Sequence, residues 1–152
     1  MNSIYRQASS IGLLRTWVAA VDVVGLAELL KSDEYFTVFA PSDDAFTKLS
    51  QNYVDELLTD FENLHANISY HIVPGRIMTP ELAQARFLRT LNKEELHIQS
   101  DRELAINGAR IIVANMECAN GVIHIIDTVL SLKKRGKVQA GAYSRTSRLR
   151  LA

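Results

Sequence analysis

The spacing of apolar residues changes once along this chain, near Phe87, and this change limits the folds that it can adopt. Before Phe87 most apolar residues recur at helical intervals, as Leu14, Trp17 and Val21 do, apart from one β-branched and aromatic stretch over 35–40. After Phe87 apolar and polar residues mainly alternate. Helices and strands that are segregated along a sequence are typical of an α+β domain rather than of a doubly wound parallel sheet. We therefore expect an α+β fold.

Local signals divide the helical half into short elements. The apolar residues of 11–30 fit two short helices joined near Gly25. A strand over Tyr35–Ala40 should end at Pro41, which has no N–H for a central ladder, and Ser42 can cap the helix that follows. The segment SDDAF is then a helix start and needs no chemistry to explain it.

The helical pattern resumes over 54–68 and divides at Asp60, which can cap its second piece. Thr79 and Pro80 then predict the cap and first residue of another short helix.

Turn dipeptides separate the expected strands of the second half. Segments 87–91 and 95–99 flank Asn92-Lys93 and predict a hairpin, while Asn107-Gly108 and Asn120-Gly121 predict two further turns. The strands should therefore pair mainly in antiparallel fashion.

Length and composition fit one folded domain. A chain of 152 residues can bury a single core without disulfide bonds, and its lone cysteine, Cys118, has no partner for a disulfide or a zinc motif. Arg6, Arg15 and Asp22 interrupt the first apolar residues, so the chain as given shows no signal peptide, and no apolar run approaches the ~20 residues of a membrane span. We expect a soluble protein without a transmembrane segment, cytoplasmic by this sequence unless a native leader has been removed.

Charge is divided unevenly along the chain. Residues 1–132 carry 10 basic and 17 acidic groups, a net charge of −7, whereas residues 133–152 carry 7 basic groups and no acidic one. Blocks of like charge with few apolar residues are typical of solvated interaction tails. We expect a folded domain over 1–132 and a flexible basic tail over 133–152 that can bind an acidic surface.

Three separated stretches carry a more specific signal: TVFAPSDDAF (Thr37–Phe46), YHIVPG (Tyr70–Gly75) and NGVIHIIDTVL (Asn120–Leu130). In this order, inside one small domain, they resemble the fasciclin (FAS1) family over about Ile4–Leu132. The resemblance implies a β-wedge of two small, mainly antiparallel sheets packed with a helical cluster. It also implies a structural role for the residues of the first and third stretches: Thr37, Phe39, Pro41, Asp43, Phe46, Asn120, Gly121, His124 and Asp127.

Candidate catalytic residues have simpler structural explanations. His71 and His124 could ligate a metal or transfer protons, but neither has an obvious ligand partner at i+2 or i+4, and each fits a buried hydrogen-bonding role. A triad of Ser42 or Cys118 with His124 and Asp127 lacks a GxSxG elbow or a basic neighbour for the thiol. No nucleotide-binding glycine loop occurs. We therefore expect no enzyme activity, no metal or other cofactor, and no specific nucleic acid partner.

The resemblance implies a non-enzymatic interaction module for cell adhesion or for binding surface or matrix proteins. In that family the Tyr-His region is associated with partner binding, which carries over to Tyr70 and His71; the alternative is that both support the core. Arg76, just after the Pro74-Gly75 turn, is the expected water-facing contact. The alternative function is that of a carrier for a small apolar ligand such as a carotenoid or lipid, held in an apolar groove.

Overall fold

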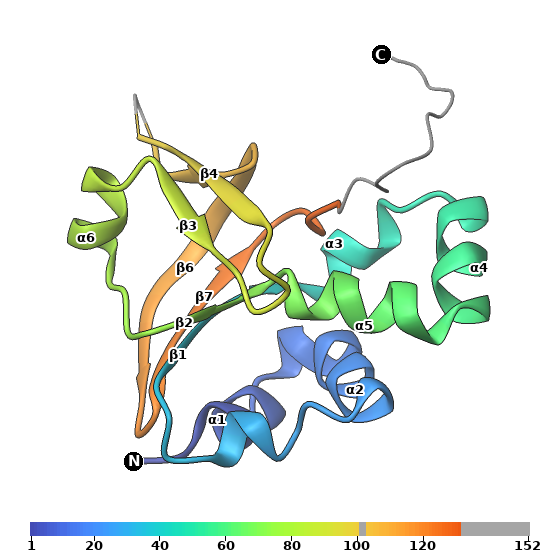
Figure 1. Ribbon diagram of the computed structural model, residues 1–152, viewed down its shortest axis with the longest axis horizontal. Helices are drawn as coiled ribbons and strands as arrows, with labels where there is room; N and C mark the ends of the chain where they lie inside the picture. Colours follow the sequence, from blue (N-terminus) through green and yellow to red (C-terminus); the bar gives the residue numbers. More distant parts are fainter. Residues whose placement is uncertain (101–102, 132–152) are drawn as a thin grey trace.

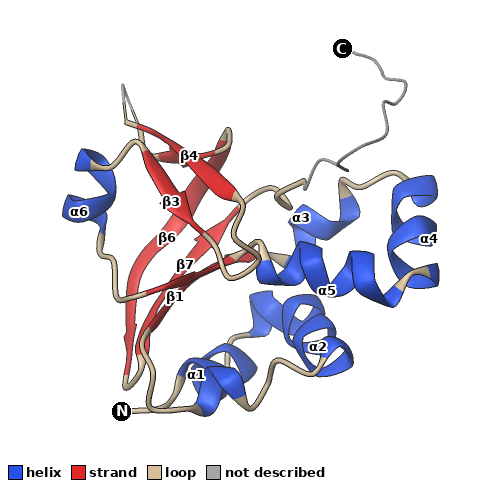
Figure 2. Cartoon of the chain, in the orientation of Figure 1, coloured by secondary structure: helices blue, strands red, loops and turns tan. Residues whose placement is uncertain are grey.

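Helices α1–α5 gather on one side of the strands, and α6 lies apart from them on the other side (Figures 1 and 2). The computed structural model describes residues 1–100 and 103–131, so the expected tail over 133–152 lies outside the described residues. The helices are α1 (Ile4–Ser9), α2 (Arg15–Val24), α3 (Asp43–Thr47), α4 (Gln51–Thr59), α5 (Phe61–Ser69) and α6 (Thr79–Gln84), with 3-10 turns over Gly12–Leu14 and Leu29–Lys31. The strands are β1 (Phe36–Pro41), β2 (Ile72–Pro74), β3 (Phe87–Arg89), β4 (Glu95–Gln99), β5 (Ala105–Ile106), β6 (Ala109–Cys118) and β7 (Gly121–Ile126).

The strands form one hydrogen-bonded ladder in the order β2-β1-β7-β6-β5-β4-β3. Only β1 and β7 run parallel, and the other neighbours pair antiparallel. The expected two small sheets are thus the two arms of a single ladder, and the register of β6 against β7 shifts between Ile111 and Met116. Bulges of this kind bend a strand and increase its twist. The α+β class and the mainly antiparallel pairing are confirmed.

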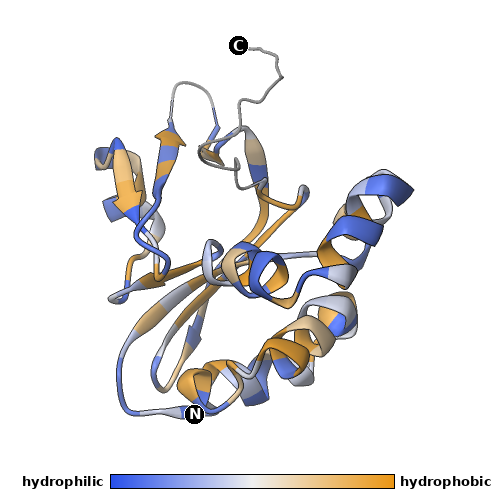
Figure 3. Cartoon of the chain, turned by 45° about the vertical axis from the view of Figure 1, so that its right-hand side comes forward, coloured by the Kyte–Doolittle hydropathy of each residue, from blue (hydrophilic) through white to orange (hydrophobic). Residues whose placement is uncertain are grey.

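β1 and β7 lie between two hydrophobic cores, and every residue of both strands is buried. On one face Val38 and Ile123 pack with Trp17 in a core that includes the N-terminal helices. On the other face Phe39 and Ile126 join a second core beneath β3–β6 and α6. Strands covered on both faces read as continuous apolar runs, which explains why these two do not alternate. In Figure 3 the central strands accordingly carry much of the hydrophobic colour.

Several helix ends form as expected. The Ser42 hydroxyl accepts a hydrogen bond from the N–H of Ala45, 3.2 Å away. Asp60 accepts hydrogen bonds at the start of α5, and Gly25 ends α2 with a left-handed φ of 80°. The hydrophobic pattern and the capping residues therefore agree about the helical half.

Three local expectations were wrong, and one helix was not anticipated. Thr79 is the first residue of α6 and not its cap; Met78 is the cap, and its N–H donates to Glu81. The segment after Gly25 forms only a 3-10 turn. Helix α1 was not anticipated from its short sequence. The β6–β7 turn is Ala119-Asn120, because Cys118 pairs with Gly121, which already belongs to β7.

Candidate functional site

Tyr70 joins the end of α5 to β4 and to the turn between β5 and β6. Its hydroxyl donates to the carbonyl of Glu95 at 2.9 Å and accepts from the side-chain amide of Asn107 at 2.8 Å. The phenol is mostly buried, and burial raises the pKa of Tyr70. Tyr70 therefore positions β4 and the β5–β6 turn, and it stays a neutral hydrogen-bonding group.

His71 joins the same helix end to Leu130, four residues after the end of β7. The ring is wholly buried against Trp17. Nε2 accepts from the N–H of Leu130 at 3.0 Å, so the proton lies on Nδ1, which donates to the carbonyl of Asn67 at 2.7 Å. Burial lowers the pKa of His71 to about 4. Both ring nitrogens are used, which leaves none for a metal or for proton transfer.

His124 has an equivalent role on the other face of the central strands. Nδ1 accepts from the N–H of Asn115 at 3.1 Å, and Nε2 donates to the carbonyl of Ile77 at 2.9 Å. The ring stacks on Phe39 with centroids 5.5 Å apart, and burial lowers the pKa of His124. Both histidines are thus buried, with hydrogen bonds at both ring nitrogens.

Polar residues of the three stretches join segments that are distant in sequence. Thr37 donates to the carbonyl of Gly75 at 2.6 Å and accepts from the N–H of Ile77, so it fixes the turn after β2. Asn120 accepts from the N–H of Ile4 and donates to two carbonyls near residue 31. Asp43 accepts from the N–H of Thr16 at 2.8 Å. These contacts agree with the structural role implied by the resemblance.

Phe46 and Pro41 contribute packing and a boundary: Phe46 lies against the helical core, and Pro41 is the last residue of β1. Asp127 accepts from the N–H of Arg110 at 2.9 Å. Partial burial alone would raise the pKa of Asp127, but this hydrogen bond and one from Thr128 hold it below its ordinary value. Asp127 thus closes the end of β7 as a carboxylate.

The side chains proposed for a triad make structural contacts instead. Ser42 caps α3, and Asp127 binds the start of β6. Cys118 is buried, and burial raises its pKa to about 11, so its thiol is a poor nucleophile. Within residues 1–100 and 103–131, no three histidine, cysteine or acidic side chains gather as a metal site.

Arg76 does not extend freely into water. Its guanidinium pairs with Glu117 of β6, and 29% of its side chain is exposed. The expected water-facing side chain is therefore only partly exposed, because it pairs with Glu117 across β6.

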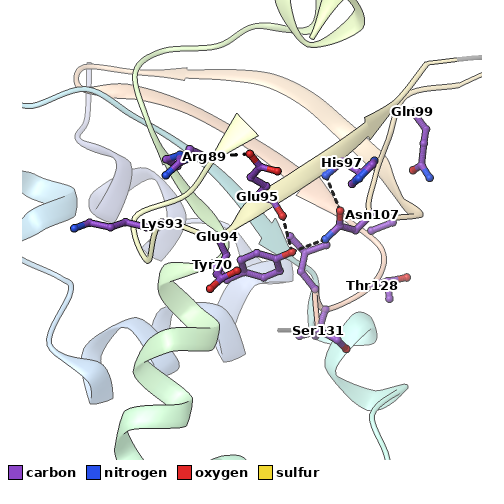
Figure 4. Close-up of a pocket in the computed structure, with 13 residues that line it drawn as sticks. Tyr70, Arg89, Lys93, Glu94, Glu95, His97, Gln99, Asn107, Thr128 and Ser131 are labelled. Carbon is purple, nitrogen blue, oxygen red and sulfur yellow. Dashed lines mark hydrogen bonds and ion pairs between the residues drawn. The ribbon is translucent and has the colours of Figure 1, made fainter. Parts of the chain in front are cut away.

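A polar groove of about 1030 Å³ lies beside Tyr70 (Figure 4). Its charges are mixed, and Arg89 lies 3.9 Å from Glu95 within it. Such a lining suits polar rather than apolar molecules. The polar side chains that line it include Arg89, Lys93, Glu94, Glu95, His97 and Gln99.

A second, apolar groove of about 520 Å³ lies between the two ends of the ladder. β2 and β3 approach each other there and are joined by a hydrogen bond from the N–H of Leu91 to the carbonyl of Ile72. The apolar side chains lining this groove are Val73, Pro74, Ile77, Phe87, Leu88 and Leu91.

β3 is the last strand of the ladder at this groove. The carbonyl of Arg86 and the N–H of Thr90 are bonded to the β4 side, so the backbone groups of Phe87 and Arg89 point the other way. Phe87 is 48% exposed. Sequence reasoning missed this surface, because it depends on which strands end the ladder and not on any local motif.

The similarity of this chain to known proteins agrees with the fold. The fasciclin domain model matches residues 12–132. The chain belongs to the fasciclin domain family. Helix α1 lies outside the matched residues, yet Ile4 is wholly buried in the same core.

Relatives place this fasciclin domain in a varied group. It is 38% identical over 118 residues to protein sll1483 of Synechocystis sp., covering 76% of this chain and 65% of that protein. It is 33% identical over 108 residues to the cell surface glycolipoprotein MPB83 of Mycobacterium bovis, covering 70% of this chain and 48% of that one. The chain thus spans less than two thirds of both relatives.

A solved structure supports the fold. A FAS1 domain pair from the insect cell adhesion molecule fasciclin I matches with a TM-score of 0.70 and 16% sequence identity. The match covers 86% of this chain and 51% of that one.

Among the described residues, no helix is both long and apolar enough to cross a bilayer.

Proposed function

We propose that this fasciclin domain is a non-enzymatic protein-binding module that acts in adhesion or in binding surface or matrix proteins. The observation that carries the proposal is the place of β3 at the end of the ladder, beside an apolar groove in which Phe87 is 48% exposed. An exposed strand edge can accept an extended segment of a partner by β-strand addition, with side-chain pockets giving specificity. MPB83 is a cell surface glycolipoprotein, and fasciclin I is a cell adhesion molecule. Similarity to these two proteins supports a role in adhesion or in binding surface proteins.

In this proposal Tyr70 and His71 position the binding surface and do not contact the partner. The hydroxyl of Tyr70 donates to the carbonyl of Glu95, which belongs to β4, and β4 pairs with β3. Arg76 lies between two residues that line the apolar groove, Pro74 and Ile77, and is the proposed adjacent contact. The Tyr-His pair would then affect binding through the hairpin that it supports.

Site-specific photo-crosslinking tests this proposal. A benzophenone amino acid at Phe87 is compared with one at Phe61, an aromatic residue of similar exposure (57%) on α5, away from the groove. Incubated with native envelope extract, the Phe87 probe should give a discrete protein adduct that unlabelled wild-type protein competes away. Equal adducts at both positions, or none that wild type competes, would contradict binding at the β3 edge.

The alternative, a carrier of a small apolar ligand, is favoured by one observation: the lining of the groove between β2 and β3 is mostly apolar. The larger groove is polar and does not suit a carotenoid or lipid chain. Solvent extraction of protein from its native host, followed by absorbance and mass spectrometry, separates the two functions. A stoichiometric apolar compound that is lost on Leu88→Glu substitution would support the carrier.

A further inference from the structure

The apolar groove between β2 and β3 carries charge of one sign. Among the described residues that line it, the charged ones are Arg89 and Lys93, and both are basic. Residues 1–132 carry a net charge of −7, so this basic lining contrasts with the acidic domain around it. A groove that is apolar and basic fits a ligand that is apolar and also negatively charged.

Both basic side chains can reach a ligand in this groove, although they also line the polar groove. The side chain of Arg89 is 68% exposed, and Lys93 is exposed as well. In Figure 4 the side chain of Lys93 points away from Tyr70, which lines the polar groove. Arg89 lies 3.9 Å from Glu95, a long contact through one nitrogen, so its guanidinium can still bind a second carboxylate.

β3 places an aromatic and a basic side chain along one face. Phe87 and Arg89 are two residues apart in the strand, so their side chains lie on the same face, about 7 Å apart along it. Leu88, between them, points to the opposite face and packs against the second core. An extended segment beside β3 would therefore meet an exposed ring and a positive charge at a spacing of two residues.

β4 shows, on the other side of β3, side chains that match this pair. His97 lies opposite Phe87, with ring centroids 4.5 Å apart, and Glu95 lies opposite Arg89. A ring and a carboxylate two residues apart thus already face β3 from β4. The same spacing in a segment on the groove side would place an apolar group against Phe87 and a second carboxylate near Arg89 and Lys93.

We infer that the partner segment bound at β3 is acidic. It is an extended stretch with an apolar side chain against Phe87 and, two positions away, an aspartate or glutamate that pairs with Arg89 and Lys93. This inference rests on the proposed binding of a protein segment at β3 and specifies the chemistry of that segment. Exposed ion pairs contribute little affinity each, so the acid determines which segment binds more than how tightly it binds.

Selection from a peptide library tests this preference. Phage that display random nine-residue peptides are selected on the immobilised full chain at ~0.1 M salt, where the screening length is about 10 Å. Phage that also bind the Phe87→Ala variant are discarded, which removes peptides attracted to the basic residues of 133–152 or to other surfaces. The remaining peptides should carry an aspartate or glutamate two positions from an apolar residue several times more often than the unselected library.

Two double variants with the same change in net charge measure the pairing. Arg89→Gln with Lys93→Gln should weaken the binding of a selected peptide about fivefold or more. The control, Arg6→Gln with Arg15→Gln, changes exposed bases of α1 and α2 and should leave binding unchanged. An amide in place of the acid of the peptide should weaken binding to wild type by a similar factor, and should have no further effect on the Arg89, Lys93 variant. Melting temperatures of all variants check that the fold is kept.

Three results would overturn the inference. Peptides that depend on Phe87 but lack an acid at this spacing, or that bind the Arg89, Lys93 variant equally well, would refute an acidic segment and leave binding at β3 in place. If no peptide distinguished wild type from Phe87→Ala, the proposed function would be contradicted as well. Self-association of the chain in sedimentation, abolished by Phe87→Ala, would assign the groove to a second copy.

Discussion

His71 and Leu130, 59 positions apart in the sequence, are joined by a hydrogen bond from the N–H of Leu130 to Nε2 of His71. The opposite ring nitrogen holds the last turn of α5. One neutral imidazole therefore connects a helix end to the segment that leaves the sheet, and its protonation would remove the acceptor for Leu130.

His71 should make stability depend on pH. Its pKa is about 4 in the folded state against 6.5 when unfolded, so between these values the unfolded chain binds more protons. The contribution of neutral His71 is complete above pH 6.5 and is lost as the pH falls to 4, about 3 kcal/mol in total. Urea denaturation of wild type and His71→Gln at several pH values checks this.

The two proteins should differ most above pH 6.5 and converge toward pH 4. Burial lowers the pKa of His124 as well, so the variant should keep part of the slope in the same direction. A constant difference between the two proteins from pH 7.5 to pH 4 would contradict the neutral, buried state of His71.

Replacement of His124 should destabilise the fold. His124→Ala leaves the N–H of Asn115 and the carbonyl of Ile77 without their partner and removes the ring stacked on Phe39. Loss of a buried hydrogen-bonding group typically costs ~1 to 3 kcal/mol. The control is His97→Ala, whose exposed ring contacts Phe87 and should cost less. Equal melting temperatures for wild type and His124→Ala would reject the structural role.

Gly121 is required by the parallel pairing of β1 with β7. A Cβ atom there would lie 1.8 Å from the carbonyl oxygen of Phe36, and the φ of 151° disfavours other residues. Gly121→Ala should therefore cost roughly 3 kcal/mol or more, or prevent folding. Gly12→Ala is the control, since no atom lies within 4 Å of its added Cβ. Similar stability of the two variants by chemical denaturation would contradict this close approach.

Sequence reasoning succeeded where one residue determines a local structure. Ser42, Asp60 and Gly25 set helix ends through their own side chains or backbone freedom, so their roles were predictable. Thr79 was misplaced by one position, because its hydroxyl binds the side chain of Asn115, 36 residues away. A distant partner of this kind leaves no local signal.

The candidate site shows the same division. The buried roles of His71 and His124 follow from their apolar surroundings, but their partners Leu130 and Ile77 depend on the topology. The ion pair of Arg76 was not predicted, because Glu117 lies 41 residues away on a strand whose register is set by a bulge. The resemblance in three short stretches was enough to predict the overall fold. The two grooves could be found only in the structure.

Arg76 allows the adjacent contact to be tested separately from folding. Arg76→Ala removes a partly exposed ion pair with Glu117, so it should change the free energy of unfolding by at most ~1 kcal/mol. If the turn contacts the partner captured at Phe87, the same change should weaken binding by several-fold, because arginine is enriched at interface hot spots. Titration calorimetry of that partner against wild type and Arg76→Ala measures this directly. Glu117→Gln serves as the control, because it breaks the same ion pair but keeps the guanidinium of Arg76. An equal loss of binding in both variants would assign the effect to the ion pair. Unchanged binding in both variants would exclude this turn as a contact.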